Sequence, residues 1–156
     1  MITHRIAVVS LAILLAGCSR SKTVSTPNGN VKVEENGNQS TVTVTGDNGA
    51  KMTIASEGTK LPDDYPKDVP VVSGAKIVMA TSATDGSSLI IESPDSFDKT
   101  VAFYKKALAD GGWKSDATVA AEKMTMYSAT KDTRHLVIQV SESEGKCSVT
   151  QSVGKK

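Results

Sequence analysis

Three Asn-Gly dipeptides, each followed by an alternating pair of aliphatic residues, are the feature that most restricts how this 156-residue chain folds. The dipeptides stand at residues 28–29, 36–37 and 48–49. The pairs that follow them are Val31 with Val33, Val42 with Val44, and Met52 with Ile54. Asn-Gly tolerates the positive φ of tight hairpin turns, and a two-residue period is typical of half-buried strands. We therefore predict a three-stranded β-meander over residues 28–58, with a thin core because it contains no aromatic residue.

Residues 71–153 carry the larger share of apolar residues and predict the main domain. Five β-rich runs fall at residues 76–80, 89–92, 124–129, 134–140 and 147–153. Short turn signals separate them, and connections of hairpin length force neighbouring strands to be antiparallel. With the helix described next, the order is ββαβββ, and an added short strand at Trp113 is left open. The expected class is α+β, with one helix packed on an antiparallel sheet.

One amphipathic helix is predicted between the second and third of these strands. Ser96 is its expected N-cap, Asp98 lies favourably near the positive end of the helix dipole, and Gly111-Gly112 ends it. Its apolar face is expected to contain Phe97, Val101, Tyr104 and Leu108, at intervals of 4, 3 and 4 residues. We expect Trp113 to fold back onto this face as a core residue.

A Pro-rich connector over residues 59–70 separates the two β-rich regions. It contains three of the five prolines, whose fixed φ and missing N–H oppose both a helix and a central strand. Its acidic residues Asp63, Asp64 and Asp68 lack the spacing of a calcium loop. We therefore interpret them as a solvated loop.

The N-terminus predicts export. A polar start with one cation, Arg5, is followed by an apolar run over residues 6–16. This run is too short for a transmembrane helix, which needs about 20 residues. We interpret residues 1–17 as a signal peptide and residues 18–27, which are polar and without hydrophobic period, as a flexible tether.

The tetrapeptide at the end of the apolar run consists of Leu15, Ala16, Gly17 and Cys18, and it resembles the lipobox of bacterial lipoproteins. The resemblance implies that Leu15, Ala16 and Gly17 are recognised by the signal peptidase. It also implies that the Cys18 thiol carries a diacylglyceryl group and palmitate-type acyl chains, which anchor the protein to a membrane. Ser19, in place of Asp, implies the outer membrane facing the periplasm in a Gram-negative host. The alternative is an ordinary signal peptide beside a coincidental cysteine.

Three further stretches, at residues 61–77, 96–113 and 126–140, resemble a family of small bacterial lipoproteins with no assigned activity. The residues that carry the resemblance are Pro62, Tyr65, Pro66, Pro70, Gly74, Ala75, Phe103, Tyr104, Gly112 and Trp113. These are turn and packing residues, so the resemblance implies a fold and a location but no chemistry. There is also a weaker, fold-level likeness to the helix-grip domains of lipoproteins in the outer-membrane barrel-assembly machinery.

Several kinds of chemistry lack the residues they need. With 18 basic and 17 acidic side chains there is no case for nucleic acid, and two cysteines and two histidines are too few for zinc or iron-sulfur sites. His135 is expected on the exposed face of a strand. Cys147 is expected to be buried beside Val149, Gln151 and Val153, since Lys146 would point the other way. We assign no catalytic, metal or cofactor site.

The acidic pairs Asp95 with Asp98 and Glu142 with Glu144 occur at predicted turns and at the helix start, where solvated charges are common. Three functional hypotheses remain. The first, which we favour because six aromatic residues are few for a binding pocket, is a non-enzymatic interaction or structural module of the cell envelope, with an envelope protein or a glycan as partner. The second is a periplasmic small-ligand carrier with a pocket between helix and sheet. The third, an envelope hydrolase, is the least favoured.

Overall fold

The computed structural model describes residues 20–27, 29–36, 39–47, 49–59, 61, 65–83 and 85–155. The expected signal peptide (1–17), its recognition residues Leu15, Ala16 and Gly17, and the lipidation site Cys18 lie outside the described residues. Pro62, Asp63 and Asp64 of the connector lie outside them as well. The expectations for all these residues stay predictions.

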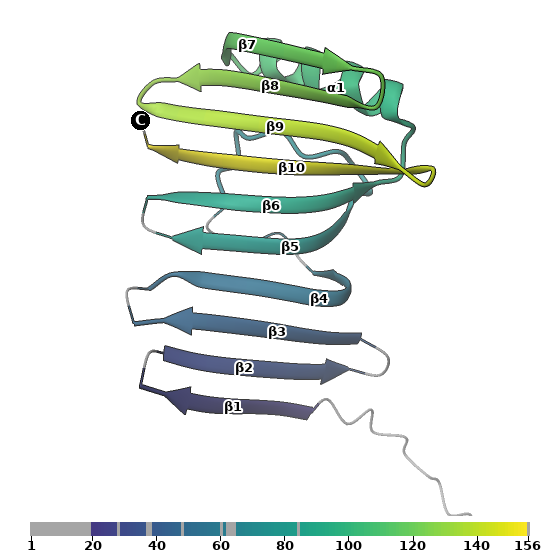
Figure 1. Cartoon of the computed structure of the whole chain (residues 1–156). Coiled ribbons are helices and arrows are strands. Elements are labelled where there is room, and N and C mark those ends of the chain that lie inside the picture. Colours follow the sequence, from purple (N-terminus) through teal and green to yellow (C-terminus); the bar gives the residue numbers. More distant parts are fainter. Residues whose placement is uncertain are drawn as a thin grey trace, which may run out of the picture.

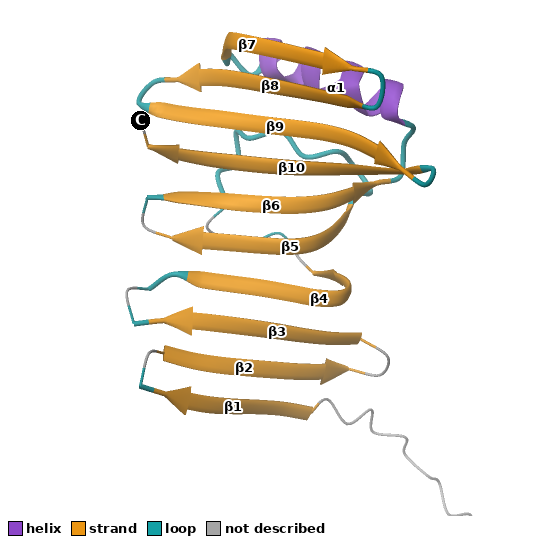
Figure 2. Ribbon diagram, viewed as in Figure 1, coloured by secondary structure: helices purple, strands orange, loops and turns teal. Residues whose placement is uncertain are grey.

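One ten-stranded sheet and one helix make up the described part of the chain (Figure 1, Figure 2). The strands are β1 (Arg20–Thr26), β2 (Gly29–Asn36), β3 (Gln39–Gly46), β4 (Lys51–Thr59), β5 (Lys76–Ala83), β6 (Gly86–Ser93), β7 (Lys114–Ala121), β8 (Met124–Lys131), β9 (Arg134–Ser143) and β10 (Lys146–Lys155). Their order across the sheet is β1-β2-β3-β4-β5-β6-β10-β9-β8-β7. All neighbouring strands are antiparallel. The predicted α+β class with a mainly antiparallel sheet is confirmed.

Strand β1 corrects the expectation of a tether over residues 18–27. β1 pairs with β2 over its whole length, from Arg20 opposite Glu35 to Thr26 opposite Gly29. All its residues are exposed, so the strand has no hydrophobic alternation by which the sequence could have revealed it. Gly29 is required at the turn, because an added Cβ would lie 2.1 Å from the Thr45 carbonyl oxygen. The N-terminal meander therefore has four strands instead of three.

The main domain contains one strand more than the predicted order ββαβββ. The strand left open at Trp113 is a full strand, β7, which begins one residue later and forms the edge of the sheet beside β8. Strand β10 lies between β6 and β9, so Val149 pairs with both Ile91 and Val140. The sheet is also continuous with the meander, since Met52 of β4 lies opposite Thr81 of β5.

Helix α1 (Phe97–Asp110) begins after Ser96 and ends at Gly111, as predicted. Gly112 follows with a positive φ of 72°, which glycine adopts without strain. Of the predicted apolar face, Tyr104 and Leu108 are buried, while Phe97 and Val101 are half-buried and packed against the core. The helix covers one face of the sheet at the β7–β9 end (Figure 1).

The hydrophobic core lies between the main part of the sheet on one side and α1 with the connector on the other. The connector supplies Tyr65, Val69 and Val72, and Trp113 is buried in the same cluster, as predicted. The sheet supplies its alternate residues, which are Ile77, Ala80, Leu89, Ile91, Tyr127, Ala129, Leu136, Ile138, Val140, Cys147, Val149 and Val153. This helix-side face is therefore the buried face of strands β5, β6, β8, β9 and β10.

The apolar residues of the meander lie on the other face of the same sheet. Residues opposite one another in an antiparallel pair share a face. Thr53 of β4 lies opposite the buried Ala80, so Thr53 is on the helix-side face. Met52 and Ile54 are therefore on the opposite face, which we call the open face. The sheet thus changes its apolar side between β4 and β5.

Candidate functional site

A groove of about 490 Å³ lies between helix α1 and the edge of the sheet formed by β7 and β8. The helix wall consists of Val101, Lys105, Leu108 and Ala109, whose spacing places them on one side of the helix. The sheet wall is formed by Ser115, Thr118, Ala120, Thr125 and Tyr127, and Trp113 lies between the two walls. Lys105 is the charged residue among those that line this groove.

Small side chains on β7 account for the groove. Thr118 lies opposite Tyr127, and Ala120 lies opposite Thr125, so both β7 residues face the helix side. Neither is large enough to fill the space beneath α1. The alternate residues of the strand, such as Val119 and Ala121, lie on the open face. The small side chains of Thr118 and Ala120 therefore leave the space between α1 and β7 open.

Tyr127 joins the two walls of the groove. Its hydroxyl donates a hydrogen bond to the carbonyl oxygen of Val101 in α1, at 3.0 Å. Burial raises the pKa of this phenol. The bond ties β8 to the helix, so the width of the groove is set by the fold.

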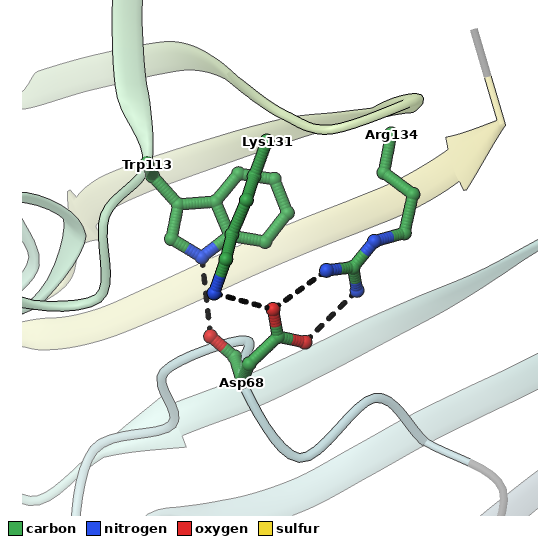
Figure 3. A network of polar contacts seen from close by, with 4 residues as sticks. All are labelled: Asp68, Trp113, Lys131 and Arg134. Atoms are coloured by element: carbon green, nitrogen blue, oxygen red, sulfur yellow. Dashed lines mark hydrogen bonds and ion pairs between the residues drawn. The ribbon is translucent and has the colours of Figure 1, made fainter.

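Trp113 closes the groove at its connector end, where it belongs to a polar cluster (Figure 3). Its indole Nε1 donates to the backbone carbonyl of Asp68 at 3.1 Å. The Asp68 carboxylate accepts two hydrogen bonds from Arg134, at 2.9 and 2.6 Å, and forms an ion pair with Lys131 at 3.0 Å. Both cations also lie near the Trp113 ring. The distance to the ring centroid is 5.9 Å from the Lys131 Nζ and 5.2 Å from the Arg134 Cζ.

This cluster corrects the interpretation of Asp68 as part of a solvated loop. The hydrogen bonds from Arg134, followed by the contact with Lys131, hold the pKa of the Asp68 carboxyl well below its usual range. The same contact raises the pKa of Arg134. The two cations come from the ends of β8 and β9, so Asp68 fastens the connector to the sheet. The connector in turn fixes Trp113.

A second buried network centres on Gln151, which is fully buried in β10. Its Nε2 donates to the Pro70 carbonyl at 2.7 Å and to the Tyr104 hydroxyl at 2.9 Å, and its Oε1 accepts from the Tyr65 hydroxyl at 2.8 Å. Burial raises the pKa of both tyrosines. The alternation of β10 placed Gln151 on the buried face, but the partners come from segments that only the fold brings together.

His135 lies on the open face of β9, half-buried, as the strand alternation predicted. Its Nε2 is 3.0 Å from the hydroxyl of Ser128. The described hollows of the protein are lined by other residues, so this pair is not in a described cleft. The Ser-His contact by itself supplies neither a third, orienting group nor a substrate pocket.

Cys147 is buried beside Val149, Gln151 and Val153, which confirms the predicted face. The Lys146 side chain points to the opposite face of the sheet, where its Nζ lies 3.9 Å from Oε1 of Glu92. Of the acidic pairs, Asp98 is exposed in the first helical turn, and Glu142 lies 3.7 Å from Lys123. Within the described residues, no group of His, Cys, Asp and Glu could hold a metal ion. The described helix is also neither long nor apolar enough to span a membrane.

These features define an α+β domain with a groove between its helix and its antiparallel sheet. Residues 72–146, which include β5, β6, α1 and β7–β9, match the family model described as START domain-like. The chain is similar to that family over this range. Comparison with curated proteins and with solved structures gave no match.

Proposed function

We propose that the chain is a membrane-anchored envelope lipoprotein whose main domain binds a small, largely apolar ligand in the groove between α1 and β7–β8. The observation that carries the proposal is the groove itself, which has mostly apolar walls and a width fixed by the Tyr127–Val101 hydrogen bond. The similarity of residues 72–146 to the START domain-like family includes both walls of the groove and supports a binding role. The small-ligand carrier thus takes precedence over the two other functions inferred from the sequence.

The lining residues indicate an amphipathic ligand. Val101, Leu108 and Ala109 offer an apolar surface, while Ser115, Thr118 and Thr125 offer hydroxyl groups on the sheet wall. Lys105 adds one positive charge. A molecule with an acyl or ring body and a single anionic or hydroxyl-bearing group matches this distribution.

The single tryptophan of the chain provides the assay, because Trp113 lines the groove. Titration with a fluorescent fatty-acid probe should change the Trp113 emission and saturate. Ala120→Phe, which fills the groove, should weaken binding at least about tenfold. Ala121→Phe adds the same ring to the open face of the same strand and should leave binding unchanged. Equal affinities in both variants would refute the groove as the binding site.

The anchor is proposed from Cys18 and the three residues before it. Metabolic labelling with a fatty-acid analogue should mark the wild-type protein but not Cys18→Ala. The variant should also leave the membrane fraction, and equal labelling of both proteins would contradict the anchor. If the host is Gram-negative, Ser19 supports placement in the outer membrane facing the periplasm.

A non-enzymatic role is part of the proposal. The double variant with His135→Ala and Cys147→Ala should keep probe binding and any cellular phenotype, provided it folds. Loss of function in a folded, membrane-bound double variant would instead favour the envelope hydrolase.

A second candidate function is a structural or interaction module that contacts an envelope protein or a glycan. The observation that favours it is the uncovered apolar surface of β1–β4. A capture experiment with a crosslinker on Met52, an exposed residue of this surface, would identify an envelope protein or glycan bound there.

A further inference from the structure

The open face of the meander carries two rows of aliphatic side chains. The first row contains Val24, Val31, Val44 and Met52, which lie opposite one another across β1–β4. The second contains Val33, Val42, Ile54, Met79 and Ile90, which continue across β2–β6. We call these nine residues the aliphatic stripe. The register, not chance proximity, aligns them.

The other face of the meander is polar. Thr23, Lys32, Thr43 and Thr53 form the corresponding row there, and the next row contains Ser25, Asn30, Thr45 and Lys51. The contrast between the two faces is as sharp as that of a strand pair on a protein core. A sheet with one such face is expected to bury it against a second layer.

Within the described chain, no helix or connector covers the stripe. Helix α1 lies behind the other end of the sheet (Figure 1), and the connector packs on the helix-side face. Val24 is 59% exposed, and Val44, Met52 and Ile54 are 40–41% exposed. These residues adjoin one another, so they form a continuous apolar patch instead of isolated surface residues.

We propose that a second copy of this chain covers the aliphatic stripe, so that two open faces pack as the layers of a β-sandwich. This inference does not rest on the ligand groove, and its experiments use the membrane-anchored form of the protein proposed above, in which the Cys18 thiol is acylated. The stripe is rich in β-branched residues, which is the composition of faces that pack sheet on sheet. An identical face offers the same shape and polarity, as a two-fold interface requires.

The charges on the open face agree with a second copy. Arg20, Lys22 and Glu35 stand together at the start of β1 and the end of β2, and the centre of the stripe holds no described charge. In a two-fold dimer these three residues can remain at the rim. A lipid surface is favoured less, because the meander lacks the aromatic residues typical of proteins that lie in a membrane interface.

A hollow beside the stripe also suits a partner side chain. It has a volume of about 300 Å³ and lies next to Val44 and Met52, where Gly46 has no side chain and Ala50 and Ala83 have small ones. The plane of β1–β6 measures roughly 600–700 Å² from ordinary strand spacing and rise. This is close to the ~800 Å² that each partner contributes to a standard interface.

Sedimentation of the full-length protein, purified from membranes in mild detergent, tests the proposal. We expect a particle with twice the mass of the chain. Ile54→Lys introduces a charge into the stripe and should raise the dissociation constant of the dimer roughly a hundredfold. Thr53→Lys places the same charge on the polar face and should leave the dimer intact. A monomeric wild type, or equal effects of both variants, would overturn the proposal.

Cysteine crosslinking in membranes decides the case if Ile54→Lys fails to fold. Val44→Cys should form a covalent dimer with a short bismaleimide, whereas Thr43→Cys, one residue away on the polar face, should not. The native Cys147 is buried and adds no background. Crosslinking at both positions, at neither, or from Val44→Cys to a different protein would overturn the inference. Ala120→Phe, which fills the groove, should leave the dimer unchanged, so failure of one proposal does not imply failure of the other.

Discussion

The two halves of the sheet have the same strand alternation, but their apolar residues are buried in one half and exposed in the other. In β6, β9 and β10 the apolar alternate residues are covered by α1 and the connector, and residues such as Leu89 and Ile138 are fully buried. In β1–β4 the apolar alternate residues lie on the other face, and Ile54 keeps 40% of its surface exposed. Alternation therefore shows that a strand has an apolar face, whereas the layer that covers this face has to be supplied elsewhere in the chain or by another molecule.

The largest expected difference between the halves is in local stability. In dilute protein, amides of β1–β4 should exchange through openings that cost roughly 0–2 kcal/mol, since few large side chains hold these strands. Amides of β9 and β10 should exchange only near the global free energy of unfolding, about 5–15 kcal/mol. Hydrogen exchange followed by mass spectrometry measures both regions at once. Equal protection of β2 and β9 would contradict the comparison, and slower exchange of β1–β4 at high concentration would indicate the second copy.

Two isoleucines give a matched test of packing. Ile138→Ala should lower the free energy of unfolding by about 2–5 kcal/mol, because it leaves a cavity in the main core. Ile54→Ala should cost less than about 1 kcal/mol in dilute protein, because its side chain already contacts water. Urea titrations of both variants provide the comparison. A cost for Ile54 equal to that for Ile138 would show that the meander has a core of its own.

The Gln151 network should contribute less than a large core side chain. Gln151→Leu leaves the Tyr65 hydroxyl and the Pro70 carbonyl without their partner, at a cost of roughly 1–3 kcal/mol. Gln139→Leu makes the same change on the open face of β9, where the side chain is half-buried. It should be nearly neutral in thermal unfolding. Similar losses in both variants would show that the network adds little.

The smallest effect is expected at Asp68, and it depends on pH. Because contacts with Arg134 and Lys131 lower the pKa of this carboxyl in the folded state, its contribution is present above the unfolded value of about 3.9. The contribution is lost as the pH falls from there through the folded pKa. Asp68→Asn should cost about 1 kcal/mol at pH 7, because the pair is partly exposed.

Urea titrations at pH 7 and pH 3 measure this dependence. The difference between wild type and Asp68→Asn should shrink at pH 3, and a constant difference would contradict the role of the ion pair. Asp116→Asn is the control. Asp116 is exposed and accepts one hydrogen bond from Thr130.

The sequence predicted those parts of the fold that depend on local signals. The hairpins of β2–β4 and of β5–β6 follow from turn residues and alternation, and α1 follows from its apolar spacing between Ser96 and Gly111. Strands β1 and β7 were missed or left open because both faces are exposed, so their pattern shows no contrast. The place of β10 next to β6 depends on pairing between distant residues, which no local pattern encodes.

The candidate groove illustrates the same limit. Trp113 and Leu108 were predicted correctly as buried residues. The groove itself arises because β7 has only small side chains on the face toward α1. The Asp68 cluster joins the connector to the ends of β8 and β9, so sequence reasoning had no means of pairing it. Six of the nine residues of the aliphatic stripe were detectable as separate pairs of residues. Its alignment across the strands required the register.

Because β10 lies between β6 and β9, the main core can form only after β10 has paired with both strands. A chain that emerges N-terminus first can pair β1–β4 one hairpin at a time and β5 with β6 through another short turn, whereas the longer connector separates β4 from β5. The main core, however, stays unfinished until residues 146–155 arrive, because Ile91 and Val140 meet only through Val149. A truncated chain would thus expose Leu89 and Ile91 to proteases. Pairing of β10 with β6 and β9 and protection of the main core from degradation are therefore coupled.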